Sequence, residues 1–259
     1  MKENIFKKIF KSLFFKNGSV KKIRFGPLRG KIYKVSSISG ISGWYSGHET
    51  AMQNAFKKYV KTGDTVVDIG CNWGVHALFL SDLVGISGKV IAIEPSPAVA
   101  SEAKWHFKNN NSTNVILNEC AVSDHSGKMF FSTTELSTTG HIVDAADSYG
   151  AIEVPVTTLD EISNTLQLKK INLIKIDVEG HEYKALLGSK NVLQELRPIV
   201  IIELHTPEQD LLVSKFVRNL GYLIERIDGT KIENLDQPWP DPKGVWGCII
   251  CFPPKIKNF

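Results

Sequence analysis

Acidic side chains stand at the ends of apolar segments in this 259-residue chain. Asp68 lies near the end of one such segment and is followed by Gly70 and Gly74, and Glu94 directly follows the apolar run Lys89–Ile93. Glycines in a turn let the backbone approach a ligand closely, and a helix that begins there offers free N–H groups. An acid after the second strand can accept both hydroxyls of a ribose. The spacing therefore predicts a site for a nucleoside-type cofactor.

The turn after Asp68 lacks the patterns of phosphate-binding loops. A dinucleotide fingerprint needs three glycines as GxGxxG, and a phosphate loop needs Lys followed by Ser or Thr; neither pattern follows Asp68. A nucleoside that carries something other than phosphates is the better interpretation, and S-adenosylmethionine fits it. Asn72 could hydrogen-bond either the backbone or the amino-acid part of this cofactor.

A second group of polar residues follows two later apolar segments: Asp177, Glu179, His181, Glu182, Glu203 and His205. Glu182 also suits an acid in the first turn of a helix. The carboxyl ends of neighbouring parallel strands meet at one edge of a sheet, where ligands bind. His205 titrates near neutral pH if unperturbed, so it is a candidate base, with Asp177 and Glu203 as the other candidate catalytic groups. Glu179 and His181 are candidate contacts to the substrate. The set also offers ligands for a divalent ion, but its spacing is not a recognised ligand motif, and we predict no metal.

Six segments, taken together and in this order, resemble the FkbM family of S-adenosylmethionine-dependent methyltransferases over roughly residues 45 to 205: Gly63–Gly74, Val90–Pro97, Asn114–Asp124, Val154–Asp160, Ile174–Glu182 and Pro198–Glu203. Two positions depart from the family pattern. Cys71 replaces a usual Ala and His181 a usual small residue.

The resemblance implies roles for further residues. It places Gly47 and Glu49 near the methionine end of the cofactor, although they also suit an ordinary helix start. It places the backbone of Ala121 and Val122 against the adenine ring. It also implies that Asp177 faces both the cofactor and the methyl acceptor.

Alternating apolar strands and amphipathic helices predict an α/β fold with a doubly wound, mostly parallel sheet. The family resemblance implies that this sheet is a seven-stranded, Rossmann-like methyltransferase sheet. One strand is expected over residues Val115–Val122 and one helix over residues Tyr183–Leu193. The last two apolar runs, Tyr222–Ile227 and Val245–Phe252, suit an antiparallel C-terminal edge hairpin. We expect residues 1–44 to be a lead-in segment and residues 45–259 to be the methyltransferase domain.

The first 16 residues predict a basic amphipathic helix, with apolar side chains on one side and Lys7, Lys8 and Lys11 on the other. This helix could pack on its own domain or a second copy in a homo-oligomer, or bind an anionic membrane. No segment has the length of a membrane span or the core of a signal peptide, so we predict a cytoplasmic protein, associated with the inner membrane surface if the helix binds lipid. A net charge of +4 is too weak to argue for nucleic acid.

Two smaller features complete the analysis. Cys248 and Cys251 have CxxC spacing, but residues three apart on a strand point to opposite faces, so they cannot share an ion. The loop Ser132–His141 is rich in hydroxyl groups and ends in Gly140 and His141. It suits either a flap that faces the acceptor, with His141 as a substrate contact, or a plain surface loop.

The function expected from these features is O-methylation of a sugar hydroxyl in a surface glycan or a glycosylated metabolite. Two alternatives remain open: a methyltransferase that acts on protein or RNA, and a cofactor-binding scaffold without activity. A small-molecule or glycan acceptor is the expected partner.

Overall fold

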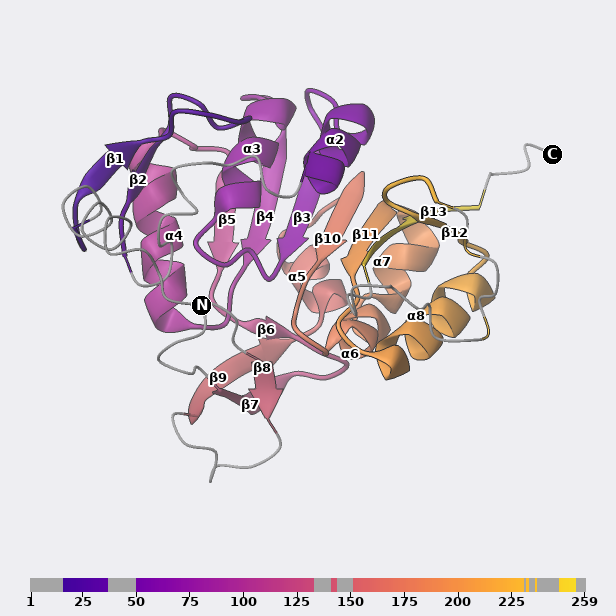
Figure 1. The fold of residues 1–259 in the computed structure, drawn as a ribbon. Coiled ribbons are helices and arrows are strands. Elements are labelled where there is room, and N and C mark those ends of the chain that lie inside the picture. The colour runs from indigo at the N-terminus through magenta and orange to yellow at the C-terminus, as the bar shows by residue number, and fades with distance from the viewer. Residues whose placement is uncertain are drawn as a thin grey trace, which may run out of the picture.

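The computed structural model describes residues 16–36, 50–132, 141–143, 151–230, 232, 236 and 247–254. Its centre is a seven-stranded sheet in the order β12-β13-β11-β10-β3-β4-β5 (Figure 1). Five neighbouring strands run parallel: β11 (Ile199–Glu203), β10 (Leu173–Ile176), β3 (Thr65–Ile69), β4 (Lys89–Ile93) and β5 (Val115–Asn118). This arrangement confirms the mostly parallel α/β sheet that the sequence predicts.

One edge of the sheet is antiparallel. β13 (Cys248–Phe252) lies between β11 and β12 (Leu223–Arg226) and pairs antiparallel with both. Three of its residues, Ile249 to Cys251, are buried, whereas Leu223 on β12 is 68% exposed. The strand that can bury both faces therefore takes the inner position, and β12 takes the edge.

Helices cover both faces of the sheet, because successive strand residues point to opposite sides. Val66 packs in a cluster with α2 (Thr50–Tyr59), α3 (Val75–Val84) and α4 (Pro97–Asn109). Its neighbour Val67 packs in a second cluster with α5 (Leu159–Thr165), α6 (Glu182–Leu187), α7 (Lys190–Glu195) and α8 (Pro207–Asn219). Cys248 contacts the first cluster and Cys251 belongs to the second, which confirms that the CxxC pair faces both ways.

A separate four-stranded sheet lies beneath the carboxyl ends of the parallel strands (Figure 1), in the order β6-β9-β7-β8. Its strands are β6 (Ala121–Val122), β7 (Gly127–Ser132), β8 (His141–Val143) and β9 (Ala151–Thr157). The single strand expected over Val115–Val122 is therefore wrong. The chain leaves the main sheet after Asn118, because Ala121 and Val122 pair with β9 and bury their side chains in the core of the small sheet and in the second cluster.

Other boundaries also differ from expectation. The single helix expected over Tyr183–Leu193 is two helices, α6 and α7, that break at Gly188. A Cβ atom at Gly188 would lie 1.9 Å from the carbonyl oxygen of Ser123, so this point packs tightly against the end of β6. Helix α5 was not expected. It begins at Thr158, whose hydroxyl oxygen accepts a hydrogen bond from the Glu161 N–H at 3.0 Å.

An antiparallel pair precedes the main domain. β1 (Val20–Lys22) pairs with β2 (Ile32–Lys34), and the fully buried Tyr33 joins the first cluster. The Lys34 N–H donates to His106 Nε2 on α4 at 3.0 Å, which fixes this pair against the helix. The expected amphipathic helix lies outside the described residues. No helix within the described ranges is long and apolar enough to cross a membrane.

Candidate active site

The turn after β3 packs directly against the turn after β10. Gly70 has a φ of +76°, and a Cβ atom there would lie 1.9 Å from the Asp177 carbonyl oxygen. Gly74 has a φ of +92°, and a Cβ atom there would lie 2.6 Å from the Phe107 ring. The sequence predicts that both glycines let a ligand approach the backbone. The structure shows a further reason for them, because both are needed for close packing within the protein itself.

Glu94 joins this turn to the connection between β4 and α4. Its Oε2 accepts a hydrogen bond from the Asn72 N–H at 3.1 Å, and its Oε1 accepts one from the Ser96 N–H at 2.9 Å. The Asn72 side chain in turn accepts from the Trp73 N–H at 2.7 Å, which is the backbone role considered for it above. Burial raises the pKa of Glu94 to about 7. A carboxylate is thus held at the end of β4, where a ribose could meet it.

Lys175 is a buried cation that the sequence analysis did not single out. Its Nζ lies 3.3 Å from Asp68 Oδ1 and 3.2 Å from Asp177 Oδ2, and it donates a hydrogen bond to the Gly70 carbonyl oxygen at 3.0 Å. Both carboxylate oxygens of the fully buried Asp68 have no hydrogen-bond partner within the described part of the chain. A lysine within the otherwise apolar strand β10 was the signal that could have revealed this contact, since a buried charge requires a partner.

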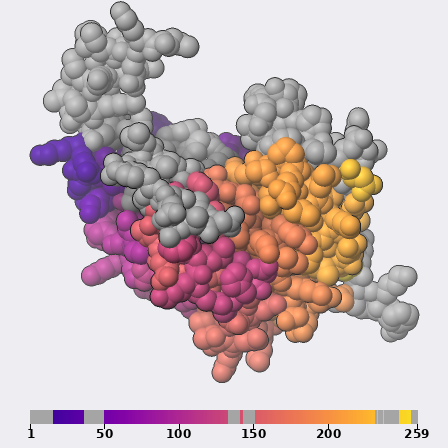
Figure 2. All heavy atoms as spheres, turned by 90° about the horizontal axis from the view of Figure 1, so that it is seen from below, coloured from indigo at the N-terminus to yellow at the C-terminus, as the bar shows by residue number. Residues whose placement is uncertain are grey.

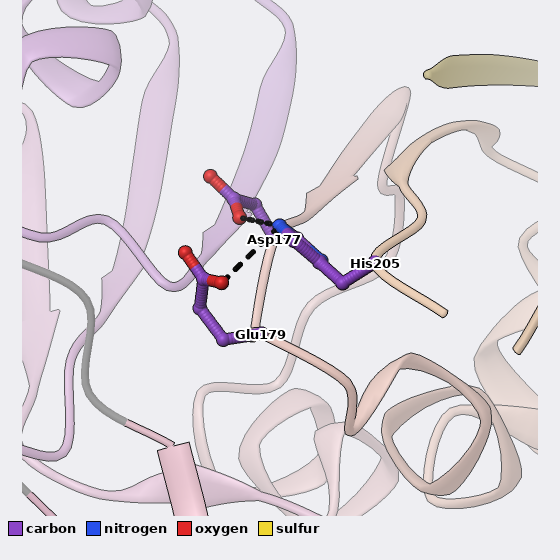
Figure 3. A group of neighbouring side chains, drawn as sticks. All are labelled: Asp177, Glu179 and His205. Atoms are coloured by element: carbon purple, nitrogen blue, oxygen red, sulfur yellow. Dashed lines mark ion pairs between the residues drawn. The ribbon is translucent and has the colours of Figure 1, made fainter. Parts of the chain in front are cut away.

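Asp177, Glu179 and His205 form a cluster at the carboxyl ends of β10 and β11 (Figure 3). His205 Nε2 lies 3.6 Å from Asp177 Oδ1 and 3.5 Å from Glu179 Oε2. One ligand atom from each of the three residues lies within 4.8 Å of the others. All three side chains are partly exposed, so a substrate or an ion can reach them.

The buried Glu182 orients the His205 ring. Its Oε1 lies 2.8 Å from His205 Nδ1 and also accepts from the Gly180 N–H at 2.8 Å. Burial lowers the pKa of His205. The hydrogen bond to Glu182 and the charges of Glu182, Glu179 and Asp177 raise it by more, so the net result is a pKa of about 9. Without other ligands, the imidazole therefore carries a proton at neutral pH. The sequence offers Glu182 as one candidate base or as an acid in the first turn of a helix, and its contact with His205, 23 positions along the chain, is one that no local pattern predicts.

Residues 68–224 match the model of the methyltransferase FkbM domain, and the matched residues make up more than half of the chain. The chain belongs to the FkbM methyltransferase family. A relative, the hexuronic acid methyltransferase AglP of Haloferax volcanii, is 30% identical over 142 residues, which cover 55% of this chain and 56% of the relative. The protein-L-isoaspartate O-methyltransferase of Methanococcus aeolicus is 27% identical over 138 residues, covering 50% of this chain and 62% of that protein. The chain thus spans little more than half the length of these relatives.

Two solved structures share the fold. The methyltransferase FkbM from Methylobacillus flagellatus has a TM-score of 0.50 and 16% identity, and the match covers 80% of this chain and 52% of that one. An S-adenosylmethionine-dependent O-methyltransferase from Thermotoga maritima has a TM-score of 0.50 and 17% identity, and the match covers 94% of this chain and 80% of that one. At this identity the likeness concerns the architecture alone.

The remaining site candidates of this FkbM methyltransferase take varied positions. Glu203 is the last residue of β11 and pairs in register with Cys248 on β13. His181 Nε2 lies 2.9 Å from the Ser123 hydroxyl, so its ring contacts the end of β6. Burial lowers the pKa of His181. Ala121 and Val122 are buried in β6, whereas Gly47 and Glu49 lie outside the described residues.

His141 lies on β8 of the small sheet and is exposed. The pKa of Glu179 is raised chiefly by burial, while the charges of His205 and His141 both lower it. His141 is therefore within electrostatic reach of the cluster at Glu179. Figure 2 shows this end of the molecule, with the small sheet beside the C-terminal half of the chain.

Proposed function

We propose that this FkbM methyltransferase uses S-adenosylmethionine to methylate a sugar hydroxyl in a glycan or a glycosylated metabolite. The observation that carries the proposal is the position of Asp177, which connects two parts of one site. Its carbonyl oxygen packs on Gly70 in the first turn, and its carboxylate reaches both Lys175 and His205. A cofactor held at the turn would therefore lie beside the acid–histidine cluster.

The residues at the turn suit S-adenosylmethionine. Glu94 offers a buried carboxylate for the ribose hydroxyls, and Asp68 has two carboxylate oxygens without hydrogen bonds in the described chain. We assign the adenine ring to the backbone near Ala121 and Val122. When bound, the cofactor supplies an electrophilic methyl group. The protein then has to hold an acceptor atom in line with that group, and this positioning supplies much of the rate enhancement.

The cluster favours a hydroxyl acceptor over an acidic one. A hydroxyl must lose its proton as it attacks, and the cluster supplies the carboxylates of Asp177 and Glu179 as candidate proton acceptors. His205 joins them only above its pKa of about 9. A carboxylate acceptor needs no base, so such a cluster would be unnecessary for it. RNA carries a negative phosphate at every nucleotide, which the acids of the cluster disfavour. The relative named as a hexuronic acid methyltransferase supports a sugar as the acceptor.

The proposal is tested by incubating the protein with S-adenosylmethionine that carries a labelled methyl group, together with separate glycan, protein and RNA fractions. We expect label in the glycan fraction only. Label confined to protein or RNA would contradict the acceptor class. Binding of S-adenosylhomocysteine without transfer to any fraction would favour the inactive scaffold.

The role of His205 is tested with the same assay. His205→Ala should lower turnover by about 10²–10⁴-fold and leave the affinity for S-adenosylhomocysteine unchanged. Asp177→Asn should weaken both cofactor affinity and turnover, because Asp177 connects the two parts of the site. Normal turnover in His205→Ala would transfer the proton-accepting role to Asp177 or Glu203, or show that positioning alone suffices.

A further inference from the structure

The Asp177, Glu179 and His205 cluster has the composition and spacing of a cation site. Ligand atoms bound to octahedral Mg²⁺ at about 2.0–2.1 Å lie about 2.9 Å apart when adjacent and about 4.1 Å apart when opposite. The nearest carboxylate oxygens of Glu179 and Asp177 lie 3.5 and 3.6 Å from His205 Nε2, and one ligand atom from each residue lies within 4.8 Å of the other two. Shortening these separations by roughly 0.6–0.7 Å would bring the three atoms onto one ion.

Glu182 provides an independent reason for a ligand at this position. Metal-binding histidines commonly donate their second ring N–H to a carboxylate, which fixes the ring orientation. Glu182 is fully buried, makes this contact to Nδ1 at 2.8 Å, and thereby turns Nε2 toward Asp177 and Glu179. Its second oxygen, Oε2, has no hydrogen-bond partner in the described chain. A buried carboxylate is costly, and its use to orient one ring indicates that the other nitrogen of that ring, Nε2, has a function.

The backbone also brings Glu179 to the cluster at a cost. Glu179 has a φ of +53°, in the left-handed region that is rare for residues other than glycine. It is followed by Gly180 with a φ of +98°, whose N–H donates to Glu182. Strain of this kind persists where the surrounding structure enforces it, and it concentrates at functional sites.

We propose that Asp177, Glu179 and His205 bind one divalent cation, Mg²⁺ or Mn²⁺, with Glu182 orienting His205 as a positioning residue. Two carboxylates and one imidazole suit these ions and leave coordination positions open. The proton that His205 Nε2 carries at neutral pH would be released to solvent when the ion binds. The acceptor hydroxyl would occupy one of them, where the ion lowers its pKa. This catalytic role rests on the proposed function, whereas binding of the ion does not. The sequence analysis predicted no metal because the spacing alone matches no known motif.

The test measures Mn²⁺ binding to the full chain by electron paramagnetic resonance, after dialysis against EDTA and without cofactor or acceptor. We expect one site. Asp177→Asn, Glu179→Gln and His205→Ala should each weaken it at least tenfold, and Glu182→Gln should weaken it about 10–100-fold. Glu195→Gln serves as the control, because Glu195 is an exposed carboxylate on α7 outside the cluster. Circular dichroism verifies that each variant is folded.

Two results would overturn the proposal: no Mn²⁺ binding by the wild-type chain, or equal binding by the wild type and the cluster variants. Activity separates the proposal from the proposed function. Glycan methylation that survives EDTA dialysis would contradict the catalytic role of the ion and support the proposed glycan methyltransferase. Mn²⁺ binding at the cluster without glycan methylation would support the cation site and contradict the proposed acceptor.

Discussion

At the scale of single residues, buried charges define the site. Lys175 lies between Asp68 and Asp177, and Glu182 orients His205, so each charge inside this end of the sheet has an oppositely charged or polar neighbour. Glu94 differs in its protonation, because burial raises its pKa to about 7. Within the described residues, the hydrogen bonds to its carboxylate come from the backbone N–H groups of Asn72 and Ser96. Its ionisation near neutral pH makes it the residue whose role is easiest to test.

Cofactor affinity should depend on the ionisation of Glu94. The carboxylate form accepts ribose hydroxyls and is populated above the pKa of about 7. Affinity for S-adenosylhomocysteine should therefore be constant above that pH and fall, by up to tenfold per unit, below it. Glu94→Ala should weaken binding by roughly 1.5–3 kcal/mol and abolish this dependence. Isothermal titration between pH 5.5 and pH 8.5 measures both effects. An unchanged affinity in Glu94→Ala would remove the residue from the cofactor site.

At the scale of elements, the close approach of two turns holds the site together. The turn after β3 touches the turn after β10 at Gly70, and the start of α3 touches α4 at Gly74. These contacts bring Asp177 beside the turn after β3. The glycines therefore serve the site by allowing the elements that carry it to approach one another.

The contact at Gly70 can be tested against a matched glycine. Gly70 and Gly229 have φ values of +76° and +80°, but a Cβ atom at Gly229 would meet nothing within 4 Å. Alanine at either position costs about 1–2 kcal/mol for the left-handed backbone. Gly70→Ala should lose a further 1–3 kcal/mol or so through the clash with the Asp177 carbonyl, and should weaken cofactor binding. Urea unfolding of both variants measures the difference. Equal losses of stability in the two variants would show that the turns after β3 and β10 can move apart without a measurable loss of folding free energy.

At the scale of the whole molecule, the site lies between two sheets. The parallel sheet supplies the cluster at its carboxyl edge, and the small sheet lies beneath that edge (Figure 1). His141 on β8 is close enough for its charge to influence Glu179. This position favours the interpretation of His141 as a residue that faces the acceptor.

Replacing His141 should therefore affect the acceptor and leave the cofactor unaffected. His141→Ala should change the Michaelis constant or the turnover measured with a glycan acceptor, and leave S-adenosylhomocysteine affinity unchanged. Lys128→Ala is the control on the same small sheet, because Lys128 is exposed and pairs with Glu153. Steady-state kinetics with the labelled methyl donor measures both variants. Normal kinetics for His141→Ala would contradict this role for His141.

The sequence by itself determined the main sheet and much of the turn after β3. Local patterns were sufficient there, because apolar runs bounded by Gly70, Gly74 and Glu94 specify strand, turn and helix through neighbours in the chain. The motifs around Asp68 and Asp177 also indicated the family that the domain match confirms.

Only the tertiary structure decided how the site is assembled. The small sheet pairs Ala121 with Val156, and Glu182 meets His205, across separations that no local pattern encodes. Gly188, where α6 ends, likewise lies so close to the Ser123 carbonyl that a Cβ atom would not fit, a contact between distant parts of the chain. Side chains that act together are brought together by strand order and packing. Their shared chemistry therefore becomes visible only when the chain is folded.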